Sequence, residues 1–184
     1  MYNTKNSKSG FTLIELIIVI LVISIFGALT ADILANAVNI YSSALNRQKF
    51  ISEARSSFFK IKREASWQKT PQSFTGSNNK KLNIFSVDGS VIDYEIKNNN
   101  KIIQNNNQIA NSNNQILTDK IDYNNSMIYY VGQQGNEINI VSQLDDVKSL
   151  MLDFQFNNGD ESIRLKGHAL PYNLHIGRAM SYHE

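Results

Sequence analysis

The sequence predicts an α+β protein, in which one long N-terminal helix packs on a C-terminal antiparallel β-sheet. Three features of the chain lead to this fold class. A nearly unbroken apolar run covers residues 11–31, apolar side chains then recur at helical spacing as far as Ala65, and short apolar segments separated by turn residues follow Pro71. A helix followed by consecutive antiparallel strands is an arrangement typical of α+β proteins.

The apolar run is long enough to cross a membrane. Its only interruptions are Thr12, Glu15, Ser24, Gly27 and Thr30. About twenty helical residues at about 1.5 Å each span about 30 Å, which is the thickness of a hydrocarbon core. Lys5 and Lys8 precede the run without any acidic neighbour. The positive-inside tendency therefore predicts a cytoplasmic N-terminus, a transmembrane helix over 11–31 and an extracytoplasmic remainder.

The helix is expected to continue beyond the membrane as an amphipathic half over residues 32–68. The apolar positions at helical spacing are Ile33, Ala37, Ile40, Ala44, Ile51, Ala54, Phe58, Ile61 and Ala65. This stripe predicts one helix over roughly 12–68 that buries one face of its outer half and ends before Pro71. Between Arg47 and Lys69 basic residues outnumber acidic ones, which fits either a subunit-contact surface facing acidic neighbours or a solvated helix face.

A β-rich globular domain is expected over residues 72–184. The predicted hairpins pair Leu82–Val87 with Val91–Ile96, Met127–Val131 with Glu137–Val141, and Val147–Phe156 with Ser162–Lys166. A further strand is predicted over Tyr172–Ile176. The Asn-rich segment 97–125 is expected to be a surface loop, to which Ile102-Ile103 and Ile116-Leu117 could add an edge strand.

Composition excludes several classes of function. The chain has no cysteine, so a disulfide framework or thiol chemistry is not possible. Without Lys5 and Lys8 the remaining basic and acidic side chains are equal in number at 16 each, which gives no support for nucleic-acid binding. His168, His175 and His183 have no acid or nucleophile at a diagnostic spacing. Asp145-Asp146 fits a loop or cap better than a calcium site. We therefore expect no catalytic residue, metal or cofactor, and no enzyme activity.

Glu15 is the most informative residue of the apolar run. A carboxylate within a membrane span is energetically costly and is by default a hypothesis for a functional site. A cleaved secretory signal or a plain membrane anchor would each explain the basic leader and the apolar run. Neither explains Glu15, nor the Gly10-Phe11 junction at the start of the run.

The segment Gly10-Phe11-Thr12-Leu13-Ile14-Glu15 resembles the cleavage and methylation motif of type IV prepilins and type II secretion pseudopilins. The resemblance implies a pilin fold and a leader peptide over residues 1–10. It implies that a prepilin peptidase cuts between Gly10 and Phe11 and that the new Phe11 amine is N-methylated. It also implies that Glu15 attracts the N-terminal amine of a neighbouring subunit and so sets the register of assembly.

Two weaker resemblances favour a minor subunit. The segment 55–65 is similar to the helix end of minor pilins of the PilW and secretion J kind. The segments 158–165 and 174–178 are similar to the last strands of MSHA biogenesis protein O. They imply a minor type IV pilin or pseudopilin in the inner membrane, with a periplasmic domain. Its expected partners are other pilins or pseudopilins, the peptidase/methylase and the assembly platform.

Two alternatives remain open at this point. Within the same class, the chain could be the J-type minor pseudopilin of a type II secretion system rather than a pilus subunit. In a different class, it could be a single-span membrane protein with a sensory or ligand-binding domain. The second alternative predicts an intact N-terminus, whereas a filament subunit predicts a mature chain that starts at Phe11.

Overall fold

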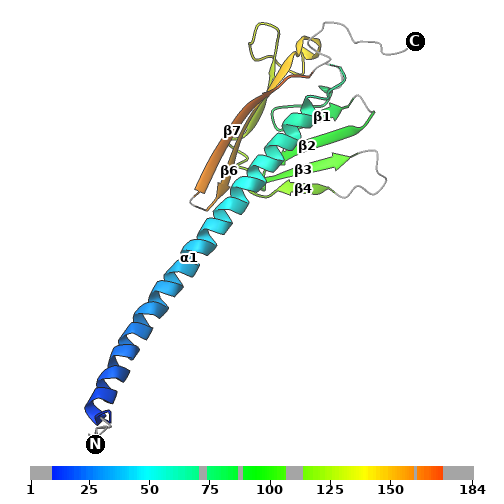
Figure 1. The fold of residues 1–184 in the computed structure, drawn as a ribbon. Helices are drawn as coiled ribbons and strands as arrows, with labels where there is room; N and C mark the ends of the chain where they lie inside the picture. The colour runs from blue at the N-terminus through cyan, green and yellow to red at the C-terminus, as the bar shows by residue number, and fades with distance from the viewer. Residues whose placement is uncertain (1–9, 71–73, 87–88, 107–113, 160, 172–184) are drawn as a thin grey trace, which may run out of the picture. The chain divides into compact units, whose positions relative to one another are not determined.

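The computed structural model describes residues 10–70, 74–86, 89–106, 114–159 and 161–171 (Figure 1). Within these residues it confirms the α+β class, because one long helix, α1, is followed by strands in two antiparallel sheets. The chain divides into two compact units, of which the first ends at Gln48 and the second begins at Lys49. Because α1 (Leu13–Ala65) contributes to both units, its two parts are described separately.

The first unit is the part of α1 up to Gln48, and its side chains are exposed throughout. At about 1.5 Å per residue this part is about 54 Å long. The hydroxyl of Ser24 donates to the backbone carbonyl of Ile20 at 2.7 Å, and that of Thr30 donates to the carbonyl of Phe26 at 2.8 Å. Both hydroxyls are therefore satisfied within the helix, as is typical of hydroxyl side chains in apolar helices.

In the second unit, α1 buries one face against both sheets. The buried side chains are Phe50, Ala54, Ser57, Phe58, Ile61 and Ala65. Their spacing of three or four residues is that of a single helical stripe. The Phe58 ring meets the Phe154 ring edge to face at 5.8 Å between centroids, and the Ser57 hydroxyl donates to the Leu117 carbonyl at 3.2 Å.

The helix ends at Ala65, a few residues before the predicted end near residue 68. Just beyond this end, Gln68 makes a tertiary contact with the first sheet. The Gln68 side chain accepts a hydrogen bond from the backbone N–H of Phe85 at 2.7 Å and donates to the carbonyl of Asn83 at 3.4 Å. The chain therefore leaves the helix to join the edge of the first sheet.

The first sheet has four antiparallel strands in the order β1-β2-β3-β4. They are β1 (Lys81–Phe85), β2 (Val91–Lys97), β3 (Lys101–Asn106) and β4 (Gln115–Thr118). The first predicted hairpin is confirmed, since Ile84 pairs with Ile92 across β1 and β2. Val87 and Asp88 lie outside the described residues, but Gly89 has φ +87°, a conformation that favours glycine in such a turn.

The Asn-rich segment contributes to this sheet instead of forming only a loop. β3 and β4 both lie within it, and Ile102 is fully buried. Asn98–Asn100 forms the turn between β2 and β3, where Asn100 adopts a left-handed backbone at φ 60°. Asparagine tolerates this conformation better than most residues. The predicted loop is thus partly a turn and partly two strands, and it includes the edge strand expected at Ile116-Leu117.

The second sheet has three antiparallel strands in the order β5-β6-β7. They are β5 (Met127–Val131), β6 (Ser149–Asn158) and β7 (Glu161–Ala169). The third predicted hairpin is confirmed, because Asn158 pairs with Glu161 across β6 and β7. The core-facing side chains of β6 are Leu150, Leu152, Phe154 and Phe156, which alternate along the strand as expected for a half-buried sheet.

The second predicted hairpin is wrong. β5 pairs with β6, and Glu137–Val141 forms no strand but only an isolated bridge between Glu137 and Val131. Ile138 and Ile140 are buried in the loop, which explains the alternation that resembled a strand. The strand predicted over Tyr172–Ile176 lies outside the described residues.

Candidate functional site

The candidate site is the junction at the beginning of α1. Gly10 and Phe11 are both exposed and precede the helix, which begins at Leu13. A Cβ added at Gly10 would meet no atom within 4 Å, so a side chain at this position would lie in open space. An exposed, side-chain-free peptide immediately before a helix is accessible to a peptidase cleft.

Thr12 and Glu15 form a capping box at the helix N-terminus. Glu15 Oε2 accepts hydrogen bonds from the backbone N–H of Thr12 at 2.8 Å and from the Thr12 hydroxyl at 2.9 Å. The Glu15 N–H donates in turn to the Thr12 hydroxyl at 3.4 Å. The carboxylate lies near the positive end of the helix dipole and satisfies two donors there. Glu15 is therefore not unpartnered in the single chain.

The helix behind this junction is long and apolar enough to cross a membrane. Its most apolar window has a mean hydropathy of 2.8 and no part of that window is buried within the chain. An apolar helix with no covered face is disfavoured in water, whereas lipid satisfies it. The finding supports membrane anchoring near the N-terminus.

The second unit contains an ion cluster in which a buried carboxylate, Asp153, is paired with two exposed cations on the second sheet. Arg164 donates two hydrogen bonds to Asp153 at 2.7 and 2.8 Å, and Lys166 Nζ lies 2.8 Å from the same carboxylate. Burial by itself would raise the pKa of Asp153, but the hydrogen bonds and charges of Arg164 and Lys166 outweigh it and hold that pKa below its usual range. The neighbouring pairs on β6 and β7 fix this cluster in the sheet, which gives it a structural role.

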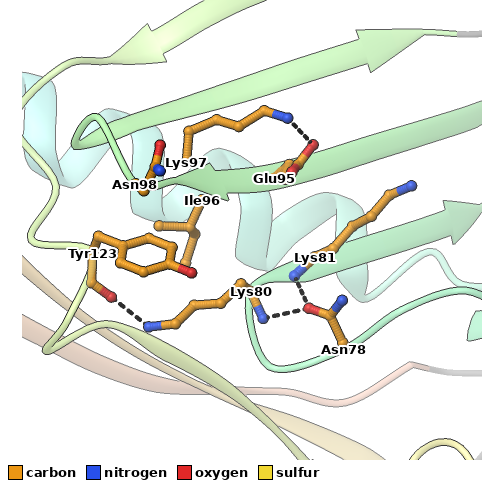
Figure 2. Close-up of a pocket in the computed structure, with 8 residues that line it drawn as sticks. All are labelled: Asn78, Lys80, Lys81, Glu95, Ile96, Lys97, Asn98 and Tyr123. Atoms are coloured by element: carbon orange, nitrogen blue, oxygen red, sulfur yellow. Dashed lines mark hydrogen bonds and ion pairs between the residues drawn. The ribbon is translucent and has the colours of Figure 1, made fainter.

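A cavity of about 410 Å³ lies beside the start of β1 and the end of β2 (Figure 2). Its lining residues are Asn78, Lys80, Lys81, Glu95, Ile96, Lys97, Asn98 and Tyr123. Figure 2 shows Lys80 reaching across the cavity floor to the carbonyl of Tyr123, and its Nζ also donates to the carbonyl of Ser126. Lys97 pairs with Glu95 at 2.6 Å.

The lysine side chains that line the cavity therefore already have partners within the chain. Lys81, the third lysine, lies 3.7 Å from Asp93. Burial lowers the pKa of Lys80, and the charge of Asp122 opposes that shift. Lys80 lies just before β1, and it contacts the carbonyls of Tyr123 and Ser126 in the segment just before β5. The cavity is therefore part of the packing between the two sheets.

The other residues considered from the sequence lie apart. His168 is exposed on β7, opposite Met151, while His175 and His183 lie outside the described residues. Asp145 and Asp146 lie in a short 3-10 helix, η2 (Leu144–Asp146), within the loop between β5 and β6. Within the described part of the chain, no three His, Cys, Asp or Glu side chains are grouped closely enough to hold a metal ion.

Gly10, Phe11 and Glu15 are brought together at one end of α1, as the motif requires. The residue that the sequence reasoning missed is Thr12, which binds Glu15 through both its backbone and its hydroxyl. A signal for this contact was present, because Thr followed three residues later by Glu, just before an apolar run, is the pattern of a capping box.

The fold and the junction together describe an α+β protein whose helix is long and apolar enough to cross a membrane and begins at Leu13, just after an exposed Gly-Phe peptide. Residues 5–31 match the model of the prokaryotic N-terminal methylation motif. The chain is thus similar to type IV pilin-like proteins in this segment, which implies processing by a prepilin peptidase and assembly with other pilins. Neither the comparison with curated proteins nor that with solved structures found a significant match.

Proposed function

We propose that the chain is a minor type IV pilin or pseudopilin, a structural subunit of a pilus or pseudopilus. The observation that carries this proposal is the capped Glu15 at the beginning of an exposed apolar helix, directly after Gly10-Phe11. In this proposal residues 1–10 are the leader and residues 11–31 are the membrane span. Residues 32–68 form an extracytoplasmic helix, and residues 72–184 form the domain.

Cleavage between Gly10 and Phe11 is the first step of the proposed mechanism. It removes a leader that carries Lys5 and Lys8, and it creates a new amine on Phe11. The amine then lies one residue before the capping box. N-methylation leaves that amine protonated, so the mature helix begins with a positive charge and carries a carboxylate one turn later.

Register is the proposed role of Glu15. Among the described residues of the single chain, hydrogen bonds from Thr12 stabilise the carboxylate but leave its negative charge in place. A neighbour's Phe11 ammonium would add a full opposite charge in a low-dielectric surrounding, where ion pairs are much stronger than in water. Only subunits displaced by the correct distance along the helix axis bring the two groups together.

The first experiment tests processing. Gly10→Val should leave the ten-residue leader attached, because the branched side chain obstructs the cleft at the scissile peptide. Gly27→Val is the matched control, since neither glycine has an atom within 4 Å of a new Cβ. Mass spectrometry of the N-terminal peptide should find N-methyl-Phe11 in the native chain and in the control only. A native chain that keeps Met1 in a peptidase-competent cell would instead favour the single-span sensor.

The second experiment tests register. Glu15→Gln should insert into the membrane normally but enter sheared filaments at least tenfold less than the native chain. Asp32→Asn is the control, because Asp32 is the next acid of the same helix and is also exposed. Equal incorporation of the two variants would show that Glu15 does not set the register of assembly. The proposal that the leader is cleaved after Gly10 would not be affected.

We further propose that the chain is inserted once into the inner membrane, with its N-terminus cytoplasmic and the β-rich domain periplasmic. Lys5 and Lys8 before the span support this orientation. Neighbouring genes would distinguish a secretion system from a pilus system. Genes for secretion components would favour the J-type pseudopilin, and genes for pilus components would favour a minor pilin.

A further inference from the structure

The exposed face of α1 in the second unit carries an unusual set of side chains. Phe59 is 56% exposed and Trp67, just beyond the helix end, is 48% exposed. Arg55 and Arg63 are exposed as well, and the four residues follow one another at intervals of four. We refer to Arg55, Phe59, Arg63 and Trp67 as the Arg–aromatic ridge.

Helical geometry places the ridge on one continuous row. Residues four apart on a helix are neighbours on its surface, separated by about 6 Å along the axis. The backbone tightens after the helix end, because the N–H of Trp67 donates to the Glu64 carbonyl at 3.0 Å, so Trp67 continues the row in a narrower turn. The Phe59 ring makes an edge contact with buried Phe58, at 5.6 Å between centroids. The aromatic part of the ridge is therefore attached to the core at Phe59.

The two guanidinium groups of the ridge are not neutralised by carboxylates of the described residues. Neither Arg55 nor Arg63 takes part in an ion pair there. Glu64, next to Arg63 in the sequence, is engaged by the Tyr94 hydroxyl instead. Glu53 is two residues from Arg55, and helical residues two apart do not face each other. The ridge therefore presents positive charge together with apolar surface.

We propose that the Arg–aromatic ridge is a docking surface for a different pilin-like subunit, whose facing helix alternates carboxylates with apolar side chains. Arginine, tryptophan and phenylalanine are the residue types that are enriched in protein interfaces. A second copy packed ridge against ridge fits poorly, since Arg55 or Arg63 would then lie close to another arginine, and a self-contact through a different face is the outcome that self-adducts would reveal. The proposal rests on the proposed function for the nature of the partner.

Photocrosslinking in the native membrane tests the location of the surface. A benzophenone amino acid replaces Phe59 in the full-length chain, and in the control it replaces Val141, which is 85% exposed in a loop. The ridge position should yield an adduct with another processed, methylation-motif subunit that is at least tenfold stronger than the control adduct. Only self-adducts, or equal adducts at both positions, would overturn the proposal.

Charge reversal tests the partner's chemistry. Arg55→Glu with Arg63→Glu should reduce the heterologous adduct at least tenfold, and Arg55→Gln with Arg63→Gln should reduce it less. The matched control is Lys101→Glu with Lys148→Glu, which changes net charge equally on two strand-end lysines. An unchanged amount of heterologous adduct in the Glu variant would overturn the proposal that the partner surface is acidic.

N-terminal mass spectrometry on the same cells separates the two proposals. Normal processing to N-methyl-Phe11 without a heterologous adduct refutes the ridge alone. Failure of processing in the native chain refutes the proposed function instead. Circular dichroism of the purified variants identifies any loss of fold, in which case the milder Gln pair decides the outcome.

Discussion

The two parts of α1 both carry many apolar side chains but bury them differently. In the first unit Phe26 is 66% exposed, and no side chain of the helix up to Gln48 is covered by the chain itself. In the second unit Phe58, on the same helix, is only 3% exposed. Apolar residues at helical spacing are buried within the chain only from Phe50 onward, whereas Ile33 and Ile40, which belong to the same predicted stripe, are 69% and 71% exposed. Apolar residues on all sides indicate a surface that lipid or neighbouring helices must cover.

The largest expected effect compares one substitution in both parts. Phe58→Ala should lower the free energy of unfolding of the second unit by about 3–5 kcal/mol, because it leaves a cavity between the helix and β6. Phe26→Ala should change it by less than about 0.5 kcal/mol, since that side chain packs on nothing within the chain. Denaturant unfolding of the full-length chain in detergent, followed by Trp67 fluorescence, measures both. Equal changes in the free energy of unfolding for the two variants would contradict the division of α1 into an uncovered part and a buried part.

A smaller effect is expected from the ion cluster, which the first unit lacks within its described residues. Asp153→Asn should cost about 1–3 kcal/mol at neutral pH, because it weakens the charged hydrogen bonds with Arg164 and Lys166. The folded-state pKa of Asp153 is lowered. Its stabilising effect is therefore complete above the unfolded pKa of about 3.9 and is lost as the pH falls through the folded pKa.

The native chain should consequently lose more stability between neutral and strongly acidic pH than Asp153→Asn does. Asp93→Asn is a suitable control on the other sheet, where the carboxylate lies 3.7 Å from Lys81. Thermal unfolding at a series of pH values measures the difference. Parallel curves for the native chain and Asp153→Asn would show that the cluster does not contribute to acid sensitivity.

The smallest effect concerns the start of the first unit. Thr12→Val should destabilise the first helical turn by about 1 kcal/mol, as is usual when an N-cap hydroxyl is removed. Amide hydrogen exchange of residues 13–16 should accelerate several-fold without any change in global unfolding. Thr30→Val is the control, since the Thr30 hydroxyl bonds only to a carbonyl that the helix already satisfies. Unaltered exchange in Thr12→Val would mean that the capping box is not formed in the membrane.

The sequence predicted what depends on local pattern. The stripe of Ala54, Phe58 and Ile61 located the buried face of α1, and the turn residues at Gly89 and Gly159 located two hairpins. The Gly10-Phe11 junction and Glu15 were found from a motif, and the structure places them at one helix end. These features need only residues that are close in the chain.

The sequence did not predict what depends on distant residues. β5 pairs with β6 across an intervening loop, and this long-range pairing is not encoded in adjacent residues. The helix end was predicted a few residues too late, and the contact of Gln68 with Phe85, which lies seventeen residues further along, could not be inferred from adjacent residues. The strands of the Asn-rich segment were hidden because they contain Gln104, Asn105, Asn106 and Gln115, residue types that usually indicate loops.

The internal hydrogen bonds of Ser24 and Thr30 have a consequence for how such helices find one another. Because each hydroxyl donates its proton to a carbonyl of its own turn, Ser24 and Thr30 offer neighbouring helices no hydrogen-bond donor and can only accept. Between Leu16 and Ala31 the helix therefore offers its neighbours mainly apolar contact, which permits rotation and sliding at little cost. The groups that select a neighbour then lie outside this stretch, in the terminal carboxylate, in the polar side chains from Asp32 onward and in the folded domain beyond Lys49.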